Sequence, residues 1–136
     1  METITDARYP IGKFIPQPFS EKQKDAWLTD ILFNPRQLEM AVLNLDEAQL
    51  NTPYREGGWT VKQLVHHVAD SHMNAYIRFK LGLTEDQPTI KPYDEEKWAL
   101  LHDVEHVPIN ISLTLLHALH TRWYDLLKHF EASDWD

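Results

Sequence analysis

The sequence predicts an all-α fold, a helical bundle in which three long helices are present. Apolar residues recur at helical spacing in three stretches, and no useful length alternates with the period of two expected of a strand. Ser20 with Gln23, and Thr60 with Gln63, have the spacing of capping boxes at helix starts. A closed antiparallel bundle usually has four helices, so we expect a four-helix bundle whose fourth helix is missing from this chain.

The first 19 residues are expected to form an extended arm, because several prolines and a glycine there disfavour a helix. A first long helix begins at about Glu21 and carries apolar residues as far as Leu45. Asn34-Pro35 interrupts it, which predicts a kink or two abutting helices. The remaining helical segments are expected at 46–50 (short), 60–83 (long), 95–103 (short) and 109–130 (long).

The end of the chain lies six residues after the third long helix, at Glu131–Asp136. We interpret residues 1–136 as one domain truncated at its C-terminal part, or as a three-helix form completed by a partner. An incomplete bundle exposes an apolar groove, so we expect the chain to associate, as a homodimer, or to leave Trp123 unusually exposed.

Composition and net charge bear on the partners, the location and the metal ligands that this chain can have. The chain has 136 residues, no cysteine and a net charge of −8. The charge argues against nucleic acid and anionic membranes as partners, since both need clustered Lys and Arg. There is no apolar signal segment or membrane span, which indicates a cytoplasmic protein. Without thiolates, any metal must be held by His, Asp or Glu.

The helix expected at 60–83 carries His66, His67 and His72 near its start. Neutral imidazole is the commonest protein ligand for transition metals, so the cluster suggests a metal site. With residues about 100° apart, His72 lies in the apolar stripe, where a packing histidine bonded to a carbonyl or a side chain is expected. His66 and Asp70 point nearly opposite the core, and His66 is expected to be solvated.

His67 lies on a flank of the stripe, in line with Ser71, Asn74 and Arg78. Spacings of four, three and four residues place these side chains in one polar strip beside the core, where they could line a cleft between helices. His67 is therefore the candidate metal ligand.

Other histidines give weaker patterns. His117 and His120 are three residues apart on the last long helix, but with no carboxylate placed beside them we interpret them as packing residues. His102 to His106 fits H-x-x-E-H, a zinc-protease signature. Pro108 follows at once and the helix is short, so we interpret this match as chance.

Several segments resemble the YfiT-like branch of the DinB superfamily: Tyr9–Gly12, Thr52–Thr60, His66–Asn74, Arg78–Leu81 and Lys91–Asp94. The superfamily signature is a Trp just before the second helix and a metal-binding His eight residues later, here Trp59 and His67. The resemblance implies a four-helix bundle, often dimeric, with a divalent metal, Zn or Ni, held by three histidines. One is His67, and the other two come from a last helix that this sequence lacks.

Three functions follow as hypotheses. The resemblance implies a metal-dependent hydrolase of a small-molecule substrate. A metal held by three imidazoles keeps an open position, where the pKa of water falls from about 15.7 to about 7. The same position suits a thiol, so the alternative is an S-transferase that uses a low-molecular-weight thiol such as bacillithiol. The third is a non-enzymatic helical binding module. Asp70, Ser71, Asn74 and Arg78 are candidates for contacts around the ligands or the substrate.

Overall fold

The computed structural model describes residues 6, 8–9 and 11–135, and over these residues the chain is all-helical, as predicted. The only pairing outside helices in this part of the chain is one isolated bridge between Pro53 and Thr60. The helices are α1 (Glu21–Val42), α2 (Glu47–Leu50), α3 (Val61–Thr84), α4 (Glu95–Trp98), α5 (His102–His106), α6 (Ile109–Lys128) and the 3₁₀ turn η1 (Ala132–Trp135).

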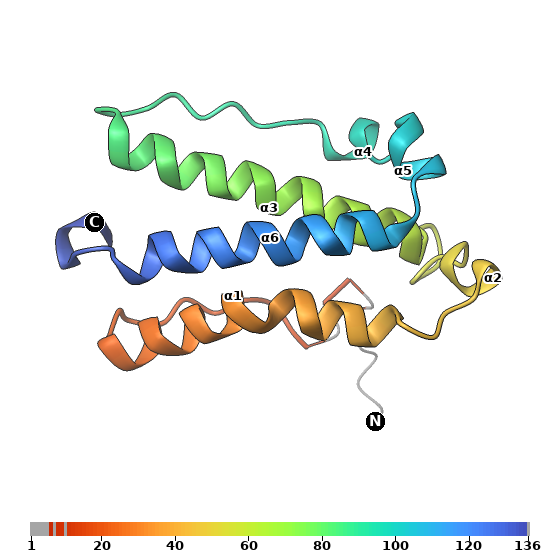
Figure 1. Cartoon of the computed structure of the whole chain (residues 1–136), viewed down its shortest axis with the longest axis horizontal. Helices are drawn as coiled ribbons and strands as arrows, with labels where there is room; N and C mark the ends of the chain where they lie inside the picture. Colours follow the sequence, from red (N-terminus) through yellow and green to blue (C-terminus); the bar gives the residue numbers. More distant parts are fainter. Residues whose placement is uncertain (1–5, 7, 10, 136) are drawn as a thin grey trace.

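The three long helices lie side by side with α6 in the middle (Figure 1). Helices α1 and α3 each pack against α6, and α5 packs against α3. The segment after α3 returns along that helix to reach α4 and α5 at its other end (Figure 1). The arrangement places the first turns of α3 next to the short helices, and this is where the histidine cluster lies.

Side-chain caps set the starts of α1, α2, α3 and α4. Thr60 accepts from the backbone amide of Gln63 while the Gln63 side chain accepts from the Thr60 amide, which is a complete capping box for α3. Asp46 forms the same box at α2. At α1 only half of the expected box forms, with the Ser20 side chain accepting from the Gln23 amide. The start of the histidine helix is thus fixed locally.

Helix α1 runs without a break from Glu21 to Val42, so the expectation of two abutting helices at Pro35 is wrong. Pro35 has no amide hydrogen, and the carbonyl four residues earlier, that of Ile31, therefore has no donor from its own helix. A side chain from α6 replaces that donor, as shown below. The prediction of one short helix at 95–103 is also wrong in detail, because α4 and α5 are separate helices divided by residues 99–101.

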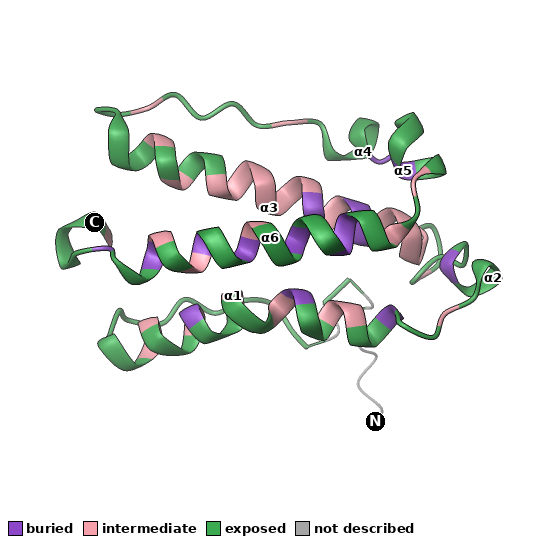
Figure 2. Cartoon of the chain, in the orientation of Figure 1, coloured by how far each residue is buried: buried purple, intermediate pink, exposed green. Residues whose placement is uncertain are grey.

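The core lies along the inner side of α6, where buried positions recur every three or four residues (Figure 2). One buried cluster joins Leu28 of α1 to Trp123, Leu127 and Phe130. Trp123 is only 7% exposed, so of the two expected outcomes of an incomplete bundle the exposure of this residue is wrong, and self-association stays a prediction. The reason is that α1 and α3 enclose α6 from both sides, so three helices are enough to bury it.

The apolar stripe of α3 is covered less completely. Within this stripe Val65 is fully buried, whereas Val68, Ala75 and Phe79 are half-buried and Leu83 is exposed. Large apolar side chains are also exposed on all three long helices, among them Leu32, Phe33, Met40, Ile77, Ile111 and Leu115. No helix among the described residues has the length and apolar character needed to cross a membrane.

Candidate functional site

The candidate ligand His67 lies in the second turn of α3, half-buried, against the indole ring of Trp59. The two ring centroids are 4.5 Å apart and the planes are inclined by 57°. Trp59 comes directly before the N-cap of α3, and its carbonyl accepts from the Tyr54 amide at 3.0 Å. The capping box and this turn therefore hold the tryptophan in place beside the imidazole.

The polar strip that continues from His67 lies on α3, where Ser71 and Asn74 are half-buried and Arg78 is exposed. Tyr93, from the segment that returns along α3, lies over Ser71. The Tyr93 hydroxyl is buried and makes no hydrogen bond of good geometry among the described residues. Burial raises the pKa of Tyr93, and the nearby Ser71 hydroxyl opposes that rise. The strip is thus partly covered, with an unused buried hydroxyl above it.

The carboxyl of Asp70 lies near charged groups of both α5 and the head of the strip. Burial raises the pKa of its carboxyl, and the charge of Asp103 on α5 raises it further. Its backbone carbonyl accepts from Asn74 Nδ2 at 2.8 Å. The charge of His67 opposes that rise in the pKa of Asp70, so this carboxyl lies between α5 and the row that begins at His67.

His66 is not solvated, contrary to the prediction from the sequence. It is 5% exposed, with Nε2 2.8 Å from the Val107 carbonyl and Nδ1 2.6 Å from Ser112 Oγ. The carbonyl can only accept, so Nε2 carries the hydrogen and Nδ1 accepts from the serine hydroxyl. Helix α5 and the first turn of α6 cover this side of α3, a contact that the apolar stripe alone does not reveal. His66 therefore joins helices.

His72 and His120 form a hydrogen-bonded pair between α3 and α6. His72 Nδ1 lies 2.6 Å from His120 Nε2, and His120 Nδ1 lies 2.6 Å from the Ile31 carbonyl oxygen on α1. The sequence indicated a packing histidine at each position but not that the two meet. The sequence signal that could have predicted this contact is that His72 and His120 both lie on the core faces of long helices.

His117 has a carboxylate beside it, which corrects the expectation that none is placed there. Its Nε2 lies 2.5 Å from Oε2 of Glu39 on α1. The side chains of His117 and Glu39 are 45% and 43% exposed, so they form a surface pair between α6 and α1. Glu39 was missed because it is 78 residues away in the sequence.

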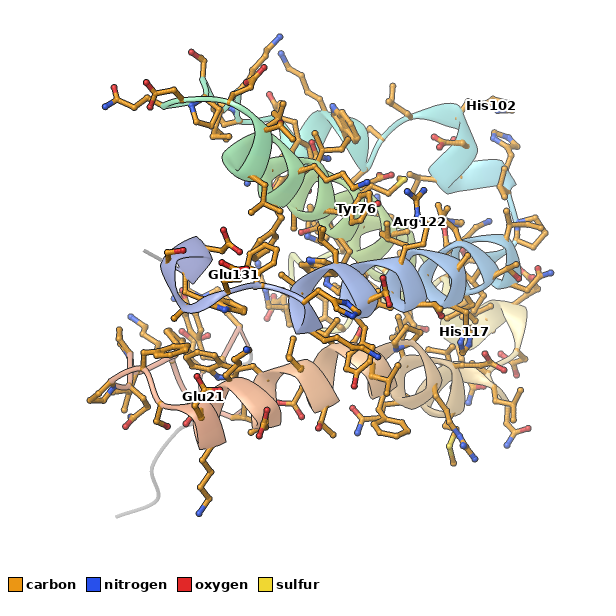
Figure 3. All side chains as sticks on the ribbon, turned by 60° about the vertical axis from the view of Figure 1, so that its left-hand side comes forward. Glu21, Tyr76, His102, His117, Arg122 and Glu131 are labelled. Atoms are coloured by element: carbon orange, nitrogen blue, oxygen red, sulfur yellow. The ribbon has the colours of Figure 1, made fainter. Side chains whose placement is uncertain are left out.

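The H-x-x-E-H match forms no metal site. His102 and His106 stack on one another in α5, with ring centroids 3.8 Å apart. Both are exposed, and His102 lies at the outer edge of the molecule, far from His117 (Figure 3).

The described residues do not make a complete metal site by themselves. Nowhere in residues 6, 8–9 and 11–135 do three His, Cys, Asp or Glu side chains come close enough to hold one ion. His67 offers one half-buried imidazole, which suits one position of a tetrahedral site. The donor set present therefore fits a part of the three-histidine site that the sequence resemblance implies.

Comparison with protein families gives a match to the model described as DinB superfamily over residues 31–136. A protein from Bacillus cereus (strain AH820) and one from Bacillus anthracis (strain A0248) are each 54% identical over 132 residues. These alignments cover 96% of this chain and 76% of each relative. Both relatives carry the name "putative metal-dependent hydrolase".

Among solved structures, the chain is similar to YfiT from Bacillus subtilis, with a TM-score of 0.92 and 48% sequence identity. The similarity covers 96% of this chain and 75% of YfiT. That protein is described as a probable metal-dependent hydrolase with an unusual four-helix bundle topology. The all-helical bundle seen here is therefore the fold of a solved relative.

Proposed function

This chain belongs to the DinB superfamily, and on that premise we propose that it is a metal-dependent hydrolase in which His67 supplies one of the metal ligands. The observation that carries the proposal is the fixed pair of Trp59 and His67 at the start of α3, with the polar strip beside it. The names of the similar proteins support the metal and the reaction class.

The remaining ligands are proposed to come from a further helix on the partly uncovered side of α3. YfiT is a four-helix bundle and extends beyond the part that this chain matches, which supports such a helix. Histidines there would complete a three-imidazole set, which is suited to Zn or Ni. The metal would then lie at the edge of the bundle core, close to the head of the polar strip.

A divalent metal with an open position supplies a Lewis acid and an activated nucleophile at neutral pH. The residues of this chain have other tasks. Trp59 restricts the orientation of the His67 ring, because the indole occupies one side of it. Ser71, Asn74 and Arg78 offer donors and acceptors to a small-molecule substrate that lies along α3. The buried Tyr93 hydroxyl lies beside Ser71 in the same row and offers a further polar group there.

The proposal is tested by following hydrolysis of 4-nitrophenyl acetate by the natural protein, first treated with EDTA and then supplied with Zn²⁺ or Ni²⁺. A hydrolase predicts turnover that requires metal and no thiol. A parallel assay supplies a small thiol with monobromobimane. Turnover only in that assay would replace the hydrolase with the S-transferase, and metal-independent behaviour in both would contradict a metal enzyme.

A further inference from the structure

The hydrogen-bond pattern of the His72–His120 pair fixes which ring nitrogens carry hydrogens. The Ile31 carbonyl can only accept, so His120 Nδ1 must donate to it across 2.6 Å. Burial lowers the pKa of His120, so its ring is neutral near pH 7 and its Nε2 is left as an acceptor. His72 Nδ1 lies 2.6 Å from that acceptor and must therefore be the donor.

His72 Nε2 therefore carries no hydrogen. Because a neutral imidazole has one hydrogen and Nδ1 uses it, Nε2 presents only a lone pair. This atom has no hydrogen-bond partner among the described residues. It is also not fully buried, because the fully buried side-chain polar atoms without a partner in this part of the chain are Asn34 Oδ1, Tyr93 OH, Trp123 Nε1 and Trp135 Nε1. It is thus an acceptor that is not fully buried, on an otherwise immobilised ring. The ring of Trp123 also lies edge-on to it, with the ring centroids 5.7 Å apart.

The last acceptor in this chain of hydrogen bonds is a backbone carbonyl oxygen of α1. Pro35 removes the amide that would ordinarily occupy the Ile31 carbonyl within the helix, and Pro35 is itself buried. That oxygen is therefore free to accept from His120. Three helices thus contribute to the orientation of one ring.

His72 and His67 border the same part of α3. Five residues on a helix place them about 140° apart around its axis. The surface between them is formed by Leu64, Val68 and Ala75, which are only half-buried. The proposed site beside His67 therefore borders the same half-buried surface of α3 as the His72 ring.

We propose that His120 is a positioning residue that holds the hydrogen of His72 on Nδ1, so that His72 Nε2 accepts a hydrogen bond from the nucleophile, water or a small thiol. This role rests on the proposed function. No proton needs to leave the nucleophile for the effect, because an acceptor directs the O–H or S–H group and thereby aims the attacking lone pair. Burial, with the charges of His120 and His67, lowers the pKa of His72 to about 4. The ring is therefore an acceptor throughout the neutral range.

The first test measures the position of the hydrogen in the natural protein by long-range ¹H–¹⁵N NMR of the histidine rings near pH 7. We expect His72 to carry it on Nδ1. His120→Gln keeps an acceptor near the place of Nε2 and should preserve this form, whereas His120→Asn keeps only the donor to Ile31 and should move the hydrogen to Nε2. A wild-type ring with the hydrogen on Nε2, or no change in His120→Asn, would overturn the positioning role.

The second test separates orientation from metal binding. His72→Asn retains a donor toward His120 but has no atom at the place of Nε2, while His72→Gln restores a polar atom there. With 4-nitrophenyl acetate and Zn²⁺ we expect His72→Asn to lower kcat about 10-fold, the effect of one hydrogen bond, with KM and metal affinity unchanged. His72→Gln should recover part of the loss.

Wild-type kcat in His72→Asn would overturn the acceptor role. Wild-type protein that hydrolyses no ester and uses no thiol would remove the proposed function and the role of Nε2 together. The NMR measurement would still decide, independently of activity, whether His120 positions His72.

Discussion

His120 Nδ1 donates to the carbonyl oxygen of Ile31 across 2.6 Å, and this bond satisfies the backbone oxygen that Pro35 leaves without a donor. A proline inside a helix normally costs about 3 kcal/mol, in part through the lost hydrogen bond. Here an imidazole from α6 recovers that bond and continues to His72 on α3. The three long helices are thereby joined by one line of hydrogen bonds through the core.

Replacing His120 by leucine is expected to destabilise the fold. The change removes the donor to Ile31 and leaves the Nδ1 hydrogen of His72 without its acceptor, at a combined cost of about 2–4 kcal/mol. Urea unfolding followed by circular dichroism measures this loss. His129→Leu, at an exposed position near the end of the same helix, is the matched control. Equal stabilities of the two variants would show that the pair contributes nothing.

Ser112→Ala tests the second buried histidine. Without the hydroxyl, His66 Nδ1 becomes a buried acceptor with no donor, and we expect a loss of about 1–3 kcal/mol in the free energy of unfolding. Thr114→Ala removes an exposed hydroxyl two residues away and should change stability by about 0.5 kcal/mol or less. The prediction fails if urea unfolding ranks the two variants in the reverse order.

Stability is expected to fall on mild acidification. Burial lowers the pKa values of His66, His72 and His120, and that of His72 falls from 6.5 to about 4. Since the folded state keeps these rings neutral while the unfolded chain protonates near pH 6.5, their contribution is full above that pH and is lost as the pH falls toward about 4. Thermal unfolding at pH 7.5 and at pH 5 measures the difference. His72→Phe should flatten the dependence, and an unchanged slope would contradict this account.

Self-association is predicted from the apolar side chains exposed on the long helices. Ile111 and Leu115 of α6 are 54% and 40% exposed, and Ile77 of α3 is 54% exposed. Apolar surface of this kind favours burial in an interface, so we expect a homodimer. Sedimentation velocity over a range of protein concentrations measures the mass. A monomer at every concentration would refute the prediction.

The sequence predicted the helices well because their signals are local. Apolar spacing and the Thr60 cap require only neighbouring residues, and α3 begins and ends within one residue of its expected bounds. The misinterpreted residues depend on distant partners. His66 is buried by α5 and α6, which periodicity within one helix does not report. Likewise, Asn34-Pro35 predicts a kink or two abutting helices from local sequence alone, because the donor that compensates for Pro35 lies 89 residues from Ile31.

Metal titration of the natural protein tests the central claim, that His67 is a metal ligand. Zn²⁺ and Ni²⁺ are titrated by calorimetry into the wild type, His67→Ala, His66→Ala and His72→Ala, with circular dichroism to confirm folding. We expect His67→Ala to lose most of the affinity, because two remaining imidazoles cannot close a tetrahedral site, while His72→Ala retains it. If His67→Ala binds metal with wild-type affinity while His72→Ala binds it more weakly, the assignment of the ligand to His67 is wrong. Unchanged binding in all three variants would contradict a metal site on α3.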